Sequence, residues 1–124
     1  MFQAIVLVML GAAVGAAARF LATHSLFSLS SNHGFPYGTL LVNAVGSFLV
    51  GYVLTWSADH KDDHWRLLAA TGFCGGFTTF SAFAYESMEY FREGRLLLLT
   101  ANVFLNNSLS FVSLIVGVRL QGTH

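Results

Sequence analysis

The stretch of residues 72–83, "GFCGGFTTFSAF", holds the side chains whose types and spacing could do chemistry in this chain. Its hydroxyl groups belong to Thr78, Thr79 and Ser81. Phe80 and Phe83 are interleaved with them, so the aromatic rings share a polar neighbourhood. Because an aromatic ring is electropositive at its edge, ring edges and hydroxyls along a narrow path would attract a small anion and still release it. A phenylalanine stripe is also typical of ordinary packing against lipid or a protein core.

Three glycines in the same stretch, Gly72, Gly75 and Gly76, indicate either a broken helix or a close crossing of two helices. Each glycine inside a helix costs about 1 kcal/mol relative to alanine. Non-helical backbone within a membrane is tolerated only where it is buried in protein or lines water. Its free carbonyl groups could then coordinate a cation. A crossing of two unbroken helices explains the glycines equally well.

Two other apolar stretches carry polar side chains at helical spacing. In the first, small or polar residues recur at every fourth position: Thr39, Asn43, Ser47 and Gly51. In the second, the similar line consists of Asn102, Asn106, Ser110, Ser113 and Gly117. Residues four apart lie on one face of a helix, and an amide within a membrane needs hydrogen-bond partners. The two faces therefore indicate either a hydrated path or a tightly hydrogen-bonded bundle.

Arg19 follows Gly11 and Gly15 at steps of four, on one face of the first apolar stretch. The two glycines would let another helix backbone approach closely. Arg19 itself lies near the end of the stretch, where an arginine commonly extends to the membrane–water interface. At that place its charge would still help to concentrate anions.

The elements that must position these residues are membrane-spanning helices. The chain is 55% hydrophobic and only 10% charged, whereas charged residues make up about a quarter of a soluble domain. A spanning helix needs about 20 mostly apolar residues. We predict four spans in a single transmembrane domain of residues 1–124, at residues 2–22, 37–56, 65–86 and 96–120. Six basic residues balance six acidic ones, which gives no argument for binding nucleic acid.

The acidic residues all lie near the ends of the predicted spans: Asp59, Asp62, Asp63, Glu86, Glu89 and Glu93. A small proton-coupled exporter of organic cations usually requires a carboxylate at the centre of a span, so that class is disfavoured. We find no catalytic set and expect the protein not to be an enzyme. His60 and His64 stand four apart beside acidic residues, but a solvated connector explains them better than a metal site.

The basic residues give almost no orientation signal. Lys61, Arg66 and Arg119 fall on one side of the predicted membrane, and Arg92 and Arg95 fall on the other. Since the side with more basic residues normally stays in the cytoplasm, so small a difference would allow insertion both ways, as an antiparallel pair of identical subunits. A single orientation fixed by marginal charges remains the alternative.

At these residues the chain resembles the CrcB/Fluc family of small bacterial fluoride channels. The matching pieces are "GAAVGAAARF" at 11–20, "YGTLLVNAVGSFLVG" at 37–51 and "GFCGGFTTFSAFAYE" at 72–86. They lie in three of the four predicted spans and in the family's order. The third piece is highly specific, and the fourth span matches by pattern more than by motif.

The resemblance implies an all-α membrane protein whose third helix is broken in mid-membrane. It also implies an antiparallel, dual-topology homodimer with two fluoride pores in a lipid bilayer, the bacterial inner (plasma) membrane. A structural sodium ion would lie at the dimer interface, and no organic cofactor is needed. The channel would let the membrane potential expel fluoride that has accumulated in the cytoplasm.

The resemblance also assigns roles to single residues. Phe80 and Phe83 would be the pore phenylalanines, accompanied by the polar pore residues Asn43, Ser81, Asn106 and Ser110. The family pattern favours a hydroxyl where this chain has Asn106. The backbone carbonyls of Gly75 and Thr78 would hold sodium. Arg19 and Glu86 match pore-mouth or structural positions.

A non-conducting assembly subunit is the remaining alternative. It would explain the glycine and asparagine faces as packing, and it would leave the interleaved phenylalanine, threonine and serine residues without a role.

Overall fold

The computed structural model describes residues 1–122, and the secondary structure in that range is helical. Three spans are single helices: α1 (Phe2–Ser25), α3 (Tyr37–His60) and α7 (Leu96–Gly122). The third span consists of consecutive pieces: α4 (Asp63–Trp65), the π-helix η1 (Arg66–Cys74), α5 (Gly75–Phe77) and α6 (Phe80–Arg92). Within the described residues, four helical segments are long and apolar enough to cross a membrane, which confirms the predicted number of spans.

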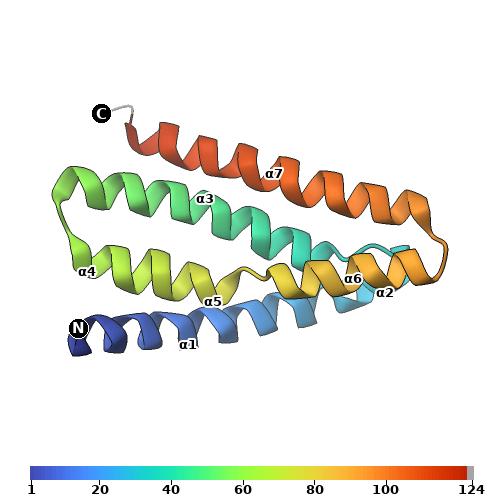
Figure 1. Cartoon of the computed structure of the whole chain (residues 1–124), viewed down its shortest axis with the longest axis horizontal. Helices are drawn as coiled ribbons and strands as arrows, with labels where there is room; N and C mark the ends of the chain where they lie inside the picture. The colour runs from blue at the N-terminus through green and yellow to red at the C-terminus, as the bar shows by residue number, and fades with distance from the viewer. Residues whose placement is uncertain (123–124) are drawn as a thin grey trace.

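The spans alternate in direction along the long axis of the molecule, so α3 and α7 run parallel to each other (Figure 1). The connection between the first two spans differs from the sequence expectation. Residues 28–36 are rich in serine and also contain asparagine, glycine and proline, a composition typical of a loop. Most of them nevertheless form the short helix α2 (Phe27–His33), which ends at Gly34 in the left-handed conformation. The first helix also continues to Ser25, beyond the predicted end at residue 22.

Glycines let α1 approach the first half of the third span closely. A methyl group at Gly11 would overlap the carbonyl of Leu68, and one at Gly15 would lie 2.9 Å from the carbonyl carbon of Phe73. On the opposite helix, a methyl group at Gly72 would lie 3.0 Å from the Cα of Gly11. Gly11, Gly15 and Gly72 therefore serve a close crossing of the two helices.

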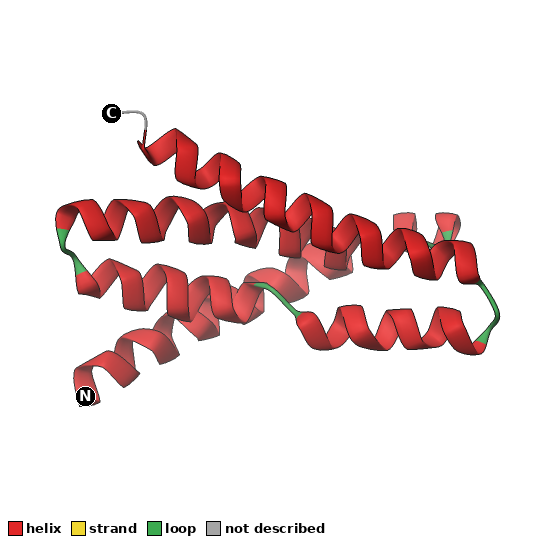
Figure 2. Ribbon diagram, turned by 45° about the horizontal axis from the view of Figure 1, so that its top comes forward, coloured by secondary structure: helices red, strands yellow, loops and turns green. Residues whose placement is uncertain are grey.

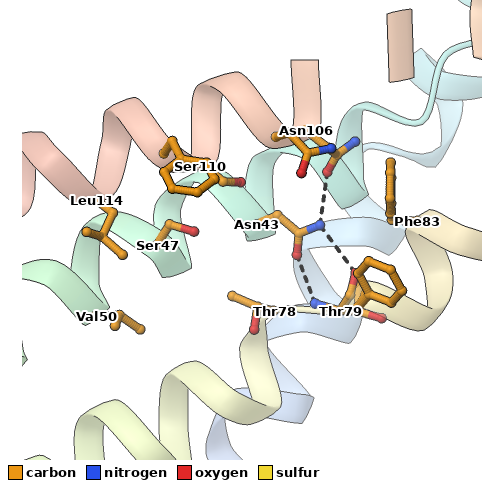
Figure 3. Close-up of a pocket in the computed structure, with 12 residues that line it drawn as sticks. Asn43, Ser47, Val50, Thr78, Thr79, Phe83, Asn106, Ser110 and Leu114 are labelled. Carbon is orange, nitrogen blue, oxygen red and sulfur yellow. Dashed lines mark hydrogen bonds between the residues drawn. The ribbon is translucent and has the colours of Figure 1, made fainter. Parts of the chain in front are cut away.

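A second pair of glycines joins α3 to α7. A methyl group at Gly51 would overlap the carbonyl of Leu114, and one at Gly117 would overlap the carbonyl of Phe48. The two parallel helices are thereby held at backbone contact (Figure 1). Asn43 and Ser47 of α3 and Asn106 and Ser110 of α7 line one pocket between the helices (Figure 3).

Apolar side chains cover most of the outside, whereas few are buried. The described apolar side chains that are buried are Phe35, Val42, Ala70, Cys74 and Phe77. Large residues such as Phe2, Leu97 and Phe111 are exposed on the surface. A soluble monomer rarely exposes so much apolar surface, so this is a multi-pass membrane protein.

Candidate functional site

The third span is interrupted at two threonines. α5 ends at Phe77, Thr78 and Thr79 take extended backbone conformations, and α6 begins at Phe80 (Figure 2). The side chain of Thr79 caps the new helix, because its Oγ1 accepts a hydrogen bond of 3.1 Å from the amide of Ala82. Threonine is well suited to this N-cap position. The interruption thus follows the glycines along the chain, and Gly72, Gly75 and Gly76 themselves remain helical.

Asn43 of α3 binds the extended backbone at the interruption. Its Oδ1 accepts a hydrogen bond of 2.8 Å from the amide of Thr79, and its Nδ2 donates one of 3.2 Å to the Thr79 carbonyl (Figure 3). In an uninterrupted α-helix the Thr79 amide would donate to the carbonyl of Gly75. Asn43 therefore accepts the hydrogen bond from the Thr79 amide that would otherwise have continued the α-helix.

Arg19 supports the interruption from the other side. Its Nε donates a hydrogen bond of 3.0 Å to the carbonyl of Gly76. The side chain is half-buried, so its guanidinium group is engaged inside the bundle rather than only at the membrane–water interface.

A furrow of about 300 Å³ runs beside the interruption between α3, the third span and α7. It brings together five of the six predicted pore residues: Asn43, Phe80, Phe83, Asn106 and Ser110. Asn43, Phe83, Asn106 and Ser110 are labelled in Figure 3. The two phenylalanine rings lie 5.6 Å apart between centroids and are tilted by 60°. The furrow is also lined by Ser47, Thr78 and Thr79, so hydroxyl, amide and aromatic groups share one open depression.

A chain of side-chain amides leads away from the furrow. Nδ2 of Asn43 donates to Oδ1 of Asn106 at 3.0 Å. Asn106 donates in turn to Oδ1 of Asn102 at 2.8 Å and to the Asn102 carbonyl at 3.2 Å. Asn102 donates to Oγ of Ser87 on α6 at 3.0 Å. The helical spacing of Asn102 and Asn106 indicates that they share one face of a helix. It gives no indication that Ser87 of another helix accepts a hydrogen bond from Asn102.

Ser81 and Glu86 lie outside the residues that line this furrow. Ser81 is exposed, and its Oγ stands 3.3 Å from Oγ1 of Thr79. Glu86 accepts a hydrogen bond of 2.9 Å from Thr39 and lines a separate cavity of about 340 Å³ between α1, α2 and α3. Its other oxygen, Oε1, is buried without a hydrogen-bond partner.

The two predicted cation ligands lie on either side of the last helical turn before the interruption. Gly75 is exposed, with no atom within 4 Å of the place where a Cβ would stand. Thr78 is half-buried, and its extended backbone directs its carbonyl out of the helical pattern. Among residues 1–122, no cluster of three or more His, Cys, Asp or Glu side chains could hold a metal ion.

The four apolar spans and the furrow define a small multi-pass membrane protein with a polar furrow between its helices. The sequence model of the family described as "CrcB-like protein, Camphor Resistance (CrcB)" matches residues 6–118. The chain therefore belongs to this family.

Similar proteins carry a more specific name. The chain is 44% identical over 110 residues to a protein of Koribacter versatilis (strain Ellin345), covering 87% of this chain and 86% of that one. It is 42% identical over 108 residues to a protein of Yersinia pestis, covering 86% and 84%. It is 39% identical over 112 residues to a protein of Clostridium novyi (strain NT), covering 89% and 87%. These relatives are named fluoride-specific ion channels FluC, a class distinct from enzymes.

Proposed function

We propose that this protein is a fluoride-selective channel that lets fluoride leave the cytoplasm passively. The observation that carries the proposal is the furrow, where two phenylalanine rings lie among amide and hydroxyl groups beside an interrupted helix. The names of the relatives support the choice of fluoride. In a bacterium the channel would lie in the inner membrane, where the inside-negative potential drives an anion outward.

In the proposed pore, polar donors and ring edges replace the water around fluoride. The edges of Phe80 and Phe83 face the ion, while Asn43, Asn106 and Ser110 supply polar contacts along the furrow. Ser81 extends the hydroxyl track at the surface. None of these groups carries a full positive charge, so the ion is held weakly enough to move on.

An antiparallel homodimer completes the pore in this proposal. Phe80 is 78% exposed on the single chain, so a narrow path along its ring needs a second surface opposite. The near balance of Lys and Arg between the two sides is compatible with insertion in both directions. Two copies related by inversion of topology would form two such paths, with the interruption of the third span at mid-membrane depth.

A structural sodium ion between the two copies fits the backbone at the interruption. The Thr79 amide is taken by Asn43, which leaves the Gly75 carbonyl without its helical donor, and the Thr78 carbonyl lies outside the helix. Hard cations prefer oxygen ligands of this kind. When bound, sodium would supply the positive charge that holds carbonyl dipoles of both copies together.

Glu86 and Arg19 are proposed as structural or pore-mouth residues. Thr39 holds the Glu86 carboxylate at one end of the bundle, and Arg19 holds the Gly76 carbonyl next to the interruption. Neither side chain lines the furrow with Phe80 and Phe83.

Fluoride efflux from liposomes tests the proposed function. Purified protein is reconstituted into liposomes loaded with potassium fluoride, valinomycin sets the potential, and a fluoride electrode records release. We expect rapid fluoride release and, in a parallel chloride assay, very little chloride release. Release no faster than from protein-free liposomes would refute the channel and favour an assembly subunit, while release that requires a proton gradient would favour a coupled transporter.

A further inference from the structure

In the chain of amides that starts at Asn43, each amide donates a hydrogen bond toward Ser87. The backbone of Thr79 sets this direction. Asn43 must turn Oδ1 to the Thr79 amide and Nδ2 to the Thr79 carbonyl, because the opposite orientation would place like groups together. An amide orientation inferred in this way follows from its hydrogen-bond partners. The second hydrogen of Asn43 Nδ2 then points to Asn106, which must accept the hydrogen bond with its Oδ1.

The same logic fixes the next two links. Asn106 Nδ2 donates to Asn102, so Asn102 also accepts with its Oδ1. Asn102 Nδ2 then donates to the hydroxyl of Ser87. Asn102 is 0% exposed and Asn106 is 5% exposed. Buried amides at such positions keep their hydrogen bonds because a buried polar group left without a partner is destabilising. The three amides therefore behave as one unit.

This direction presents the wrong group to an anion. Both hydrogens of Asn43 Nδ2 are in use, and Asn106 offers an oxygen at the place where the two side chains meet beside the furrow. An oxygen repels fluoride, whereas an N–H group would bind it. Only a change at Asn106 gives an anion two donors at this point.

We propose that fluoride binds between the amides of Asn43 and Asn106 by reversing the amides of Asn106 and Asn102 together, with Ser87 as the terminal group that makes reversal possible. This inference rests on the proposed function. After reversal, the Ser87 hydroxyl donates to Asn102, Asn102 donates to Asn106, and Asn106 turns its N–H toward the ion. A hydroxyl can end the chain in either direction because it both donates and accepts.

The hydrogen-bond balance explains why the reversal depends on the anion. Before reversal, three side-chain bonds link Asn43 to Ser87. After reversal, two remain, and two N–H groups bind fluoride in place of the Asn43–Asn106 bond. The hydrogen bond of 3.2 Å from Asn106 to the Asn102 carbonyl is also lost, and Oδ1 of Asn106 then faces that carbonyl oxygen. The bound anion must offset this repulsion as well. Without an anion, the reversed chain would set two N–H groups against each other, which disfavours that state.

The site would accept an anion that is small and a strong hydrogen-bond acceptor. Larger halides accept hydrogen bonds more weakly. Their hydrogen bonds to Asn43 and Asn106 would not offset the free energy of the hydrogen bonds that are lost on reversal. Asn102 and Ser87 never touch the ion in this scheme, so they are positioning residues, and Asn106 binds the ion directly.

Nuclear magnetic resonance of side-chain amides reads out the reversal without measuring transport. The full-length protein is labelled with ¹⁵N-asparagine, kept in the detergent in which it forms its native assembly, and titrated with sodium fluoride or with sodium chloride. We expect saturable shifts of the Asn106 and Asn102 NH₂ signals with fluoride only. Asn32, exposed on α2, is the internal control and should not shift. Unchanged Asn106 and Asn102 signals in a preparation that conducts fluoride would overturn the inference and leave the channel proposal intact.

Substitution of Ser87 tests the terminal group. Ser87→Asp keeps an acceptor for Asn102 but removes the donor that the reversed chain needs. The fluoride-dependent shift of Asn102 should therefore disappear, and fluoride efflux should fall about tenfold, the factor that matches the loss of one buried hydrogen bond. Ser87→Thr keeps a hydroxyl that both donates and accepts, and it should keep the shift and the efflux. Thr100→Asp is the matched control, because it adds the same charge on α7 at an exposed hydroxyl that bonds only the Leu96 carbonyl of its own helix. Efflux by Ser87→Asp equal to that of the unchanged protein would contradict the scheme.

Discussion

Arg19 on α1 and Gly76 in the third span are joined by a hydrogen bond of 3.0 Å from the guanidinium Nε to the backbone carbonyl. This bond reaches a carbonyl two residues before the interruption, where the helical ladder ends. The bond links the end of α5 to α1, and the hydrogen bond between Asn43 and the Thr79 amide links the start of α6 to α3. The interruption is therefore held by side chains from two different spans.

Replacement of Arg19 should destabilise the protein more than it changes ion selectivity. Arg19→Ala leaves the half-buried Gly76 carbonyl without its donor, and we expect a loss of about 1 kcal/mol or more. The melting temperature of the purified protein in detergent measures the effect. Arg119→Ala, at an exposed position near the end of α7, is the control and should melt like the unchanged protein. Equal melting of both variants would show that the Arg19 bond contributes little.

Replacement of Phe80 or Phe83, the proposed pore phenylalanines, should remove most of the conduction and leave the fold in place. Phe80→Ile and Phe83→Ile remove the electropositive ring edge but keep apolar bulk, so each should lose most of the fluoride current. Liposome efflux measures the current, and size-exclusion chromatography checks the assembly. Near-normal currents in both variants would contradict the pore role of these rings.

The close crossing of α1 and the third span predicts a strong effect of a single methyl group. Gly15→Ala places a Cβ 2.9 Å from the Phe73 carbonyl carbon and 3.1 Å from its Cα, so the two backbones must separate. We expect a destabilisation of about 1–3 kcal/mol or more, typical of overpacking, measured by thermal unfolding. Gly122→Ala has open space around it and serves as the control. A Gly15→Ala variant as stable as that control would contradict the described contact.

The proposed dual topology predicts which fused dimers conduct fluoride. Two copies joined by a linker that forces opposite orientations should conduct fluoride, whereas two copies forced into the same orientation should not. Liposome efflux from each fusion gives the result. Conduction by the parallel fusion alone would rule out the antiparallel pair.

The spans could be predicted from the sequence because long apolar runs leave few alternatives in a membrane. The predicted ranges 2–22 and 37–56 fall within α1 and α3. Helix ends were predicted less well: α1 runs on to Ser25, and α2 forms in a segment whose serines, asparagine and glycine are typical of a loop. Local composition does not report the packing that keeps such a short segment helical.

Most of the residues predicted for the pore line the furrow, Ser81 being the exception, but the hydrogen bonds that connect them could not be predicted. The types of Phe80, Phe83 and Asn43 and their surroundings in the sequence pointed to one polar neighbourhood, and the furrow does bring them together. The place of the interruption, after rather than at the glycines, depends on Asn43 taking the Thr79 amide from another helix. Ser87 joins the amide chain only because α6 packs against α7. Pairings between spans of this kind have no signature in a single sequence.

The interruption also divides the third span between two partners. Its first half, η1 and α5, packs mainly on α1, whereas α6 packs on α7. A tilt of α6 relative to η1 and α5 would be taken up at Thr78 and Thr79, the two residues between these helices. Both threonines also line the furrow, so such a tilt would change the width of the furrow beside Phe80.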